Sequence, residues 1–176
     1  MVEALAQHLA TKIKRASPHQ TASVPVMKFA LIIVINFMVP TVASLLFGAM
    51  TGKLLETLTA MGYFIALRIL SGGYHFETPV LCMVATCITF ALPPHLELNG
   101  QWTLMLTTLS LLMVLILAPS NMRGYNTIPE KYYPLLKLFS VLIVCSNFII
   151  LSGTAAIVLA VQGITLLFRN KEVKPT

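Results

Sequence analysis

Long apolar stretches dominate this chain, and short polar turns separate them. After the first 28 residues there are six apolar segments, at 29–50, 54–70, 79–96, 103–118, 134–151 and 154–168. Several are shorter than the ~20 residues that cross a bilayer at a simple tilt. The pattern predicts one all-α, polytopic membrane bundle of about six spans over 29–168, within a single domain that covers 1–176.

Two of these segments are weaker candidates for spans. The second contains Glu56 and Arg68, and the sixth is short and contains Gln162 and Gly163. Polar and ionisable groups are costly inside the hydrocarbon of a membrane. A bundle of four spans, with these two segments buried or re-entrant, is therefore the alternative.

The stretch that precedes the first apolar segment has a different periodicity. In residues 2–15, Leu5, Leu9 and Ile13 lie about one helical turn apart, and basic residues gather near the end. This spacing predicts an amphipathic helix that lies on the membrane surface. Pro18 begins a linker after it.

Composition supports the membrane assignment and excludes one class of function. The chain is 57% hydrophobic and only 10% charged, whereas soluble domains carry about 25% charged residues. Its net charge of +6 comes from residues at the ends of apolar runs, with no basic stripe and no interleaved aromatics, so no nucleic-acid partner is expected. The positive-inside rule predicts cytosolic termini and a cytosolic turn at 71–78.

The segment 68–82, RILSGGYHFETPVLC, is the richest in chemically active side chains. Thr78 followed by Pro79 predicts an N-cap with proline at the first helical position. Cys82 then lies in the opening turn of a helix, where the free amide groups and the helix dipole favour a thiolate.

His75 precedes Cys82 by seven residues, a distance of about 10 Å along one continuous helix. Gly72 and Gly73 permit a turn that folds the histidine back over the helix start. The pair then supports nucleophilic catalysis, in which His75 takes the thiol proton and the thiolate attacks a peptide carbonyl. A purely structural histidine and cysteine are the alternative.

The segment and the rest of the chain contain further polar residues, cysteines and histidines. Arg68 either binds a substrate carboxylate or braces the loop, and Glu77 is a candidate to orient His75. Cys87 and Cys145 lie in apolar stretches and are expected to be small core residues. The scattered histidines His8, His19 and His95 do not form a metal site, and no metal or other cofactor is expected.

The same segment resembles the AgrB family, the accessory gene regulator peptidases. The matching pattern is R-x4-G-x-H-x6-C at Arg68, Gly73, His75 and Cys82, followed by Ala118-Pro119 and a polar-basic loop that extends to Lys137. The resemblance covers the hydropathy pattern of nearly the whole chain.

The resemblance implies that His75 and Cys82 are the catalytic pair and that Arg68 and Gly73 are required motif residues. It also implies a bacterial cell-membrane enzyme, a homodimer, that cleaves the C-terminal tail of an AgrD-like propeptide through a thioester on Cys82. An internal Cys or Ser of the propeptide then closes a thiolactone or lactone ring, and the product is an autoinducing peptide for quorum sensing. No cofactor is implied.

The polar-basic loop and the function of the chain each have more than one interpretation. Arg123, Lys131 and Lys137 are more dispersed than the lysine-rich stretch usual in the family; they either attract an acidic propeptide tail or only fix topology. A peptide exporter and a catalytically silent scaffold are the rival functions. The small number of polar residues in the apolar segments argues against an exporter.

Overall fold

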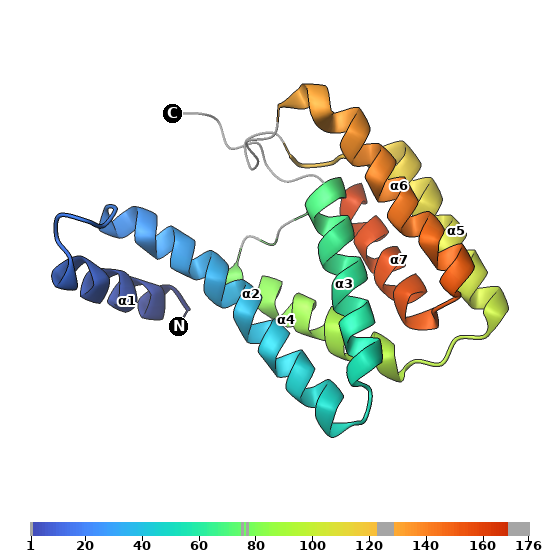
Figure 1. Cartoon of the computed structure of the whole chain (residues 1–176), viewed down its shortest axis with the longest axis horizontal. Helices are drawn as coiled ribbons and strands as arrows, with labels where there is room; N and C mark the ends of the chain where they lie inside the picture. Colours follow the sequence, from blue (N-terminus) through green and yellow to red (C-terminus); the bar gives the residue numbers. More distant parts are fainter. Residues whose placement is uncertain (1, 75, 77, 123–128, 169–176) are drawn as a thin grey trace.

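The structure, a computed structural model, describes residues 2–74, 76, 78–122 and 129–168. Within these ranges the chain forms seven α-helices and two short 3₁₀ turns, and no β-strand is present. The predicted all-α bundle is confirmed. The helices are α1 (Val2–Ala16), α2 (Val24–Met50), α3 (Leu54–Ser71), α4 (Pro79–Ala91), α5 (Gly100–Leu117), α6 (Tyr133–Ile150) and α7 (Gly153–Leu167), with η1 (Pro93–His95) and η2 (Glu130–Tyr132) (Figure 1).

Four of the described helices are long and apolar enough to cross a membrane. They are α2, α3, α5 and α6 together with η2. The shorter apolar helices are α4 with η1 and α7, which are the third and sixth segments of the sequence pattern. The chain is therefore a membrane protein, but the expectation that the second and sixth segments were the weak ones is wrong for the second.

The positions of charges and prolines explain this difference. Glu56 lies in the first turn of α3 and pairs with Lys53 at 3.4 Å, while Arg68 lies in its last turn. The apolar middle of α3 is thus free of charge. In the third segment, Pro93 and Pro94 end the regular helix early, since proline lacks the amide proton and restricts the residue before it.

Helix α7 forms the centre of the bundle. It packs against α3 and α5, and nine of its fifteen residues are buried. The core cluster around it consists of Leu67, Val114, Ala118, Val144, Leu159 and Leu166. A Cβ on Gly163 would lie 2.9 Å from Met113 Sδ, so the absence of a side chain there permits the close approach of α5 and α7.

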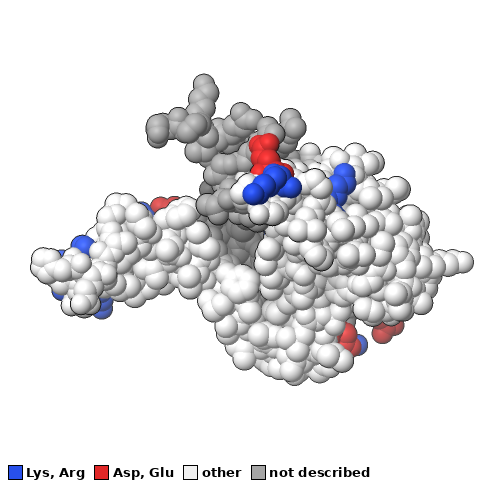
Figure 2. All heavy atoms as spheres, turned by 45° about the horizontal axis from the view of Figure 1, so that its top comes forward, with Lys and Arg blue, Asp and Glu red and all other residues white. Residues whose placement is uncertain are grey.

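Helices α1 and α2 form a hairpin that projects from the rest of the bundle (Figure 1). The predicted helix at 2–15 is confirmed, and it turns Ala6 and Ala10 toward α2. Further along, α2 packs against α4, with Ser44 Oγ 3.8 Å from Cys87 Sγ. The face drawn in Figure 2 is mostly uncharged, and its acidic and basic residues gather in a few separate clusters.

Candidate active site

The ends of α3, α5 and α7 meet at the segment that carries the sequence motif. After α3 ends at Ser71, Gly72 and Gly73 adopt φ values of 72° and 125°, a backbone region that favours glycine. The Ser120 amide donates to the Ser71 carbonyl at 2.9 Å, and the Gly73 amide donates to the Ser120 carbonyl at 3.1 Å. This short bridge ties the glycine turn to the chain just beyond α5.

The C-terminal end of α7 holds both of these loops. The last carbonyl groups of a helix lack partners within the helix. The Tyr74 amide donates to Thr165 O at 3.0 Å, and Ser120 Oγ donates to Leu166 O at 3.4 Å. Asn121 Nδ2 donates to Phe168 O at 2.7 Å. The carbonyl groups at the end of α7 thus connect the motif loop to the loop after α5.

Arg68 reaches from the last turn of α3 into this junction. Its Nη1 donates to Thr165 Oγ1 at 3.2 Å, and its Nη2 donates to the Tyr74 carbonyl. The guanidinium thus lies beside the C-terminal end of α7, which carries the negative end of the helix dipole. Of the two roles considered for Arg68, these contacts show the bracing of the loop.

Gly73 is buried at the centre of these contacts. A Cβ at this position would overlap Arg68 Nη1 and would lie 2.6 Å from Thr165 Oγ1 and 3.2 Å from Gln162 Nε2. With its φ of 125°, the position is unsuited to any residue with a side chain. The structure therefore gives a local reason for glycine at this motif position.

Cys82 lies in the opening turn of α4, as predicted. Thr78 is the N-cap, and its Oγ1 accepts a hydrogen bond from the Leu81 amide at 3.4 Å, with Pro79 at the first helical position. The Cys82 amide donates to Thr78 O at 3.2 Å. The Cys82 side chain is half-buried and is close enough to Arg68 for an electrostatic interaction between them.

The other predicted site residues lie in the loops around α4 and α6 or in the first turns of α6. His75, Glu77 and Arg123 lie outside the described residues. Lys131 is exposed in η2, with Nζ 4.9 Å from the centre of the Tyr132 ring, and Lys137 is half-buried in the first turns of α6. The structure thus brings Arg68 and Gly73 together and puts Cys82 within electrostatic range of Arg68.

Two residues of α7 that contact this loop were missed by the sequence analysis. Gln162 and Thr165 both hydrogen-bond to the motif segment. A signal was present, because a glutamine in an otherwise apolar membrane segment is a functional candidate in its own right. In the sequence, Gln162 marks the sixth segment as a weaker span, and its partners become visible only in the fold.

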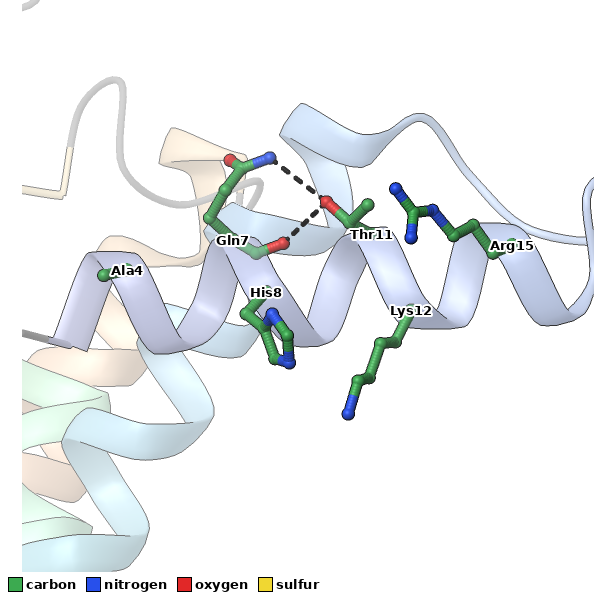
Figure 3. A pocket seen from close by; sticks show the side chains of 6 residues that line it. All are labelled: Ala4, Gln7, His8, Thr11, Lys12 and Arg15. Carbon is green, nitrogen blue, oxygen red and sulfur yellow. Dashed lines mark hydrogen bonds between the residues drawn. The ribbon is translucent and has the colours of Figure 1, made fainter.

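A separate hollow lies along α1 (Figure 3). Ala4, Gln7, His8, Thr11, Lys12 and Arg15 line it, and Thr11 Oγ1 donates to the Gln7 carbonyl at 2.9 Å. All six residues come from one helix and none is a cysteine, so this surface is distinct from the motif segment. Within the described ranges, no three His, Cys, Asp or Glu residues are placed to hold a metal ion.

Comparison with known proteins supports the resemblance found in the sequence. The family model described as accessory gene regulator B matches residues 3–168. No curated protein and no solved structure matches the chain. The matched range includes the whole motif from Arg68 to Cys82. It also includes all seven described helices, apart from Val2 at the start of α1. The chain therefore belongs to the accessory gene regulator B (AgrB) family and has a role in the accessory gene regulator system.

Proposed function

We propose that this protein is a membrane cysteine endopeptidase that removes the C-terminal tail of an AgrD-like propeptide and promotes its cyclisation. The observation that carries the proposal is the position of Cys82 in the first turn of α4, just after the motif turn that Arg68 holds through its hydrogen bonds. Family membership supplies the class of substrate.

In the proposed first step, His75 takes the proton from Cys82 Sγ, and the thiolate attacks the carbonyl carbon of the scissile peptide bond. The carbon–nitrogen bond then breaks, and the His75 imidazolium gives its proton to the departing amine. The propeptide remains attached to Cys82 as a thioester. In the first turn of α4, Pro79 has no amide proton and the Leu81 and Cys82 amides donate to Thr78, so the Val80 amide is the backbone donor proposed to stabilise the oxyanion that forms on the way.

In the second step, an internal Cys or Ser of the propeptide attacks the thioester carbonyl. The bond to Cys82 breaks, its sulfur leaves as a thiolate, and a thiolactone or lactone ring forms. The proton lost by the attacking group restores the thiol or the imidazolium. No external oxidant or energy source enters either step, because one acyl group is passed between nucleophiles.

Basic residues near the start of α6 are proposed to attract the substrate on the cytosolic side of the membrane. Arg123, Lys131 and Lys137 give the loop before α6 and its first turns a positive charge, which favours an acidic tail. The positive-inside rule assigns this side, both termini and Cys82 to the cytosol of a bacterial cell. There α1 lies on the membrane surface. The family resemblance adds a homodimer.

The test is to co-express the chain with the propeptide encoded beside its gene and to follow cleavage by mass. Cys82→Ala and His75→Ala abolish cleavage, while Cys87→Ala, the same change at another half-buried cysteine of α4, retains it. A covalent propeptide adduct on Cys82, removed by hydroxylamine, identifies the thioester. Unchanged processing in the Cys82→Ala variant would reject the peptidase and leave export or scaffolding as the function.

A further inference from the structure

Gln162 is a fully buried amide in α7, the central helix of the bundle. Its side chain has 0% exposure, and it lies on α7 among alanine, valine and leucine residues. Nε2 donates to Ser71 Oγ at 3.1 Å and to the Gly72 carbonyl at 2.7 Å. One side chain of α7 thus holds two consecutive residues at the point where α3 ends.

Thr165 follows on the same face, three residues later. Its Oγ1 accepts from Arg68 Nη1 at 3.2 Å and donates to Gln162 O at 2.7 Å, and it lies 3.3 Å from Gln162 Oε1. Its backbone carbonyl accepts from the Tyr74 amide at 3.0 Å. The hydroxyl therefore links the Arg68 guanidinium to Gln162 of α7, chiefly through the Gln162 backbone carbonyl.

Together, Gln162 and Thr165 make contacts along the whole turn. They hydrogen-bond to Ser71, Gly72 and Tyr74, and the space beside Gly73 is filled by their side-chain atoms and by Arg68. The next residue in the chain is His75. The path of the backbone from Ser71 to Tyr74 is thus set by two residues about ninety positions further along the chain.

A stability role alone does not account for these side chains. A buried amide or hydroxyl gains little over an apolar residue of similar shape, because its hydrogen bonds only offset the loss of its solvation. Hydrogen bonds are directional, so a buried polar network fixes the orientation of each group to which it is bonded. Here the hydrogen bonds that Gln162 and Thr165 make across to α3 and the segment after it all involve the 71–74 turn or Arg68.

We propose that Gln162 and Thr165 are positioning residues for the peptidase, which fix the 71–74 turn and Arg68 so that His75 and Cys82 are correctly placed for reaction. This inference rests on the proposed function. Neither residue touches the reacting atoms in the proposal; both act through the turn. A displacement of a catalytic group by about 1 Å costs as much as 100-fold in rate, so a modest loosening of this turn is sufficient to be measured.

The test uses a background with Cys87→Ala and Cys145→Ala, in which Cys82 is the only cysteine. Thr165→Val removes the hydroxyl at nearly constant volume, Thr165→Ser retains it, and Gln162→Met removes the amide. Thr154→Val makes the same change at a buried threonine near the beginning of α7 and serves as the control. Two rates are measured on protein of equal folded fraction: alkylation of Cys82 by iodoacetamide, and cleavage of the propeptide encoded beside the gene.

Thr165→Val and Gln162→Met are expected to lower kcat by about 10- to 100-fold with little change in KM, and to slow the alkylation of Cys82. Thr165→Ser restores both rates, and Thr154→Val leaves both unchanged. Wild-type rates in Thr165→Val and Gln162→Met, while Cys82→Ala abolishes cleavage, would overturn this inference alone. A loss of cleavage with Cys82 alkylation unchanged would also overturn it, since the reactive pair would then be intact.

The two proposals fail in different ways. If Cys82→Ala still processes the propeptide, the peptidase mechanism is rejected whatever the α7 variants do. If Thr165→Val reduces cleavage only in proportion to the amount of folded protein, the threonine is structural and the peptidase stands. The alkylation rate requires no propeptide, and so it reports on the placement of the turn even without a cleavage assay.

Discussion

The side chains of Arg68 and Thr165 are joined by a hydrogen bond of 3.2 Å, although 97 positions separate them in the sequence. The bond connects the last turn of α3 with the last turns of α7. The motif loop is consequently held by a helix that carries none of the motif residues. Changes at either end of this bond affect the same turn, which allows the site to be tested from both sides.

Arg68→Lys keeps the positive charge but loses the forked guanidinium. A lysine has a single ammonium group and does not reproduce the two separate bonds to Thr165 and Tyr74. Loss of one hydrogen bond to a charged group is worth about 1.5–3 kcal/mol, which corresponds to a reduction of about tenfold or more in propeptide cleavage. The measurement is the cleavage rate at equal amounts of membrane-inserted protein. Cleavage within twofold of wild type would show that charge alone suffices.

Gly73→Ala is expected to abolish cleavage while the helices remain. The added Cβ meets Arg68 and Thr165, and the φ of 125° imposes backbone strain of about 1–3 kcal/mol on alanine. Gly62→Ala is the matched control, because a Cβ there has nothing within 4 Å and lies inside α3. That control should gain about 0.5–1 kcal/mol of stability from its helix propensity and keep its activity. Circular dichroism and the cleavage assay together separate the two variants.

The sequence predicted the local features of the site and not its long-range support. Thr78, Pro79 and Cys82 are neighbours in the chain, so capping rules were enough to place the cysteine in the opening turn of α4. The bonds from Gln162 and Thr165 depend on how α7 packs against α3. Hydropathy reports that a helix is apolar, but it does not report which helices become neighbours.

The same limit explains the assignment of the spans. The apolar segments were located correctly, whereas Glu56 and Arg68 made the second one look weak. Whether a charge interrupts a span depends on its distance from the helix ends, and both charges lie in end turns of α3. Proline acts differently from a charge in an end turn: Pro93 and Pro94 follow α4 directly, and they end the regular helix of the third segment.

Asn147→Leu is expected to destabilise the bundle at the end away from the motif. Its buried amide donates to Thr107 Oγ1 at 2.9 Å and to Ser152 O at 3.2 Å, and its Oδ1 accepts from the Ser152 amide at 3.1 Å. Hydrogen bonds between membrane helices are worth about 0.6 kcal/mol on average and up to about 1.7. We expect a loss of about 1–2 kcal/mol in detergent unfolding, since several bonds disappear together. Thr108→Val, an exposed position on α5, should change stability by less than about 0.5 kcal/mol.

Asn36→Leu, in contrast to Asn147→Leu, is expected to raise the stability of the protein. Among the described residues, Asn36 Oδ1 is the one buried side-chain nitrogen or oxygen without a hydrogen-bond partner. Pro40, four residues later, also lacks the amide that would pair with the Asn36 carbonyl in a regular helix. Because an unpaired buried acceptor costs about 1–3 kcal/mol, leucine at this position should raise the stability of α2 in detergent unfolding. A fall in stability would contradict this.

The orientation in the membrane is open to direct chemical labelling. Hydrogen bonds join the segments that follow α3 and α5 to each other and to the end of α7, so these three helices end on the same side of the bundle. The turns before α3, α5 and α7 lie on the opposite side. Positive-inside arguments assign the first side to the cytosol. In a variant that lacks all three native cysteines, Gln101→Cys should react with a membrane-impermeant maleimide in intact cells, because it lies at the start of α5 and is exposed.

His19→Cys, exposed in the linker between α1 and α2, provides the matched position on the opposite side. It should react only after the cells are lysed. Labelling of His19→Cys in intact cells, with Gln101→Cys protected, would reverse the orientation and place the Cys82 end of α4 outside. A cytosolic propeptide tail would then be unable to reach Cys82. The labelling pattern therefore tests the membrane topology and, independently of any cleavage assay, the access of the proposed substrate to the site.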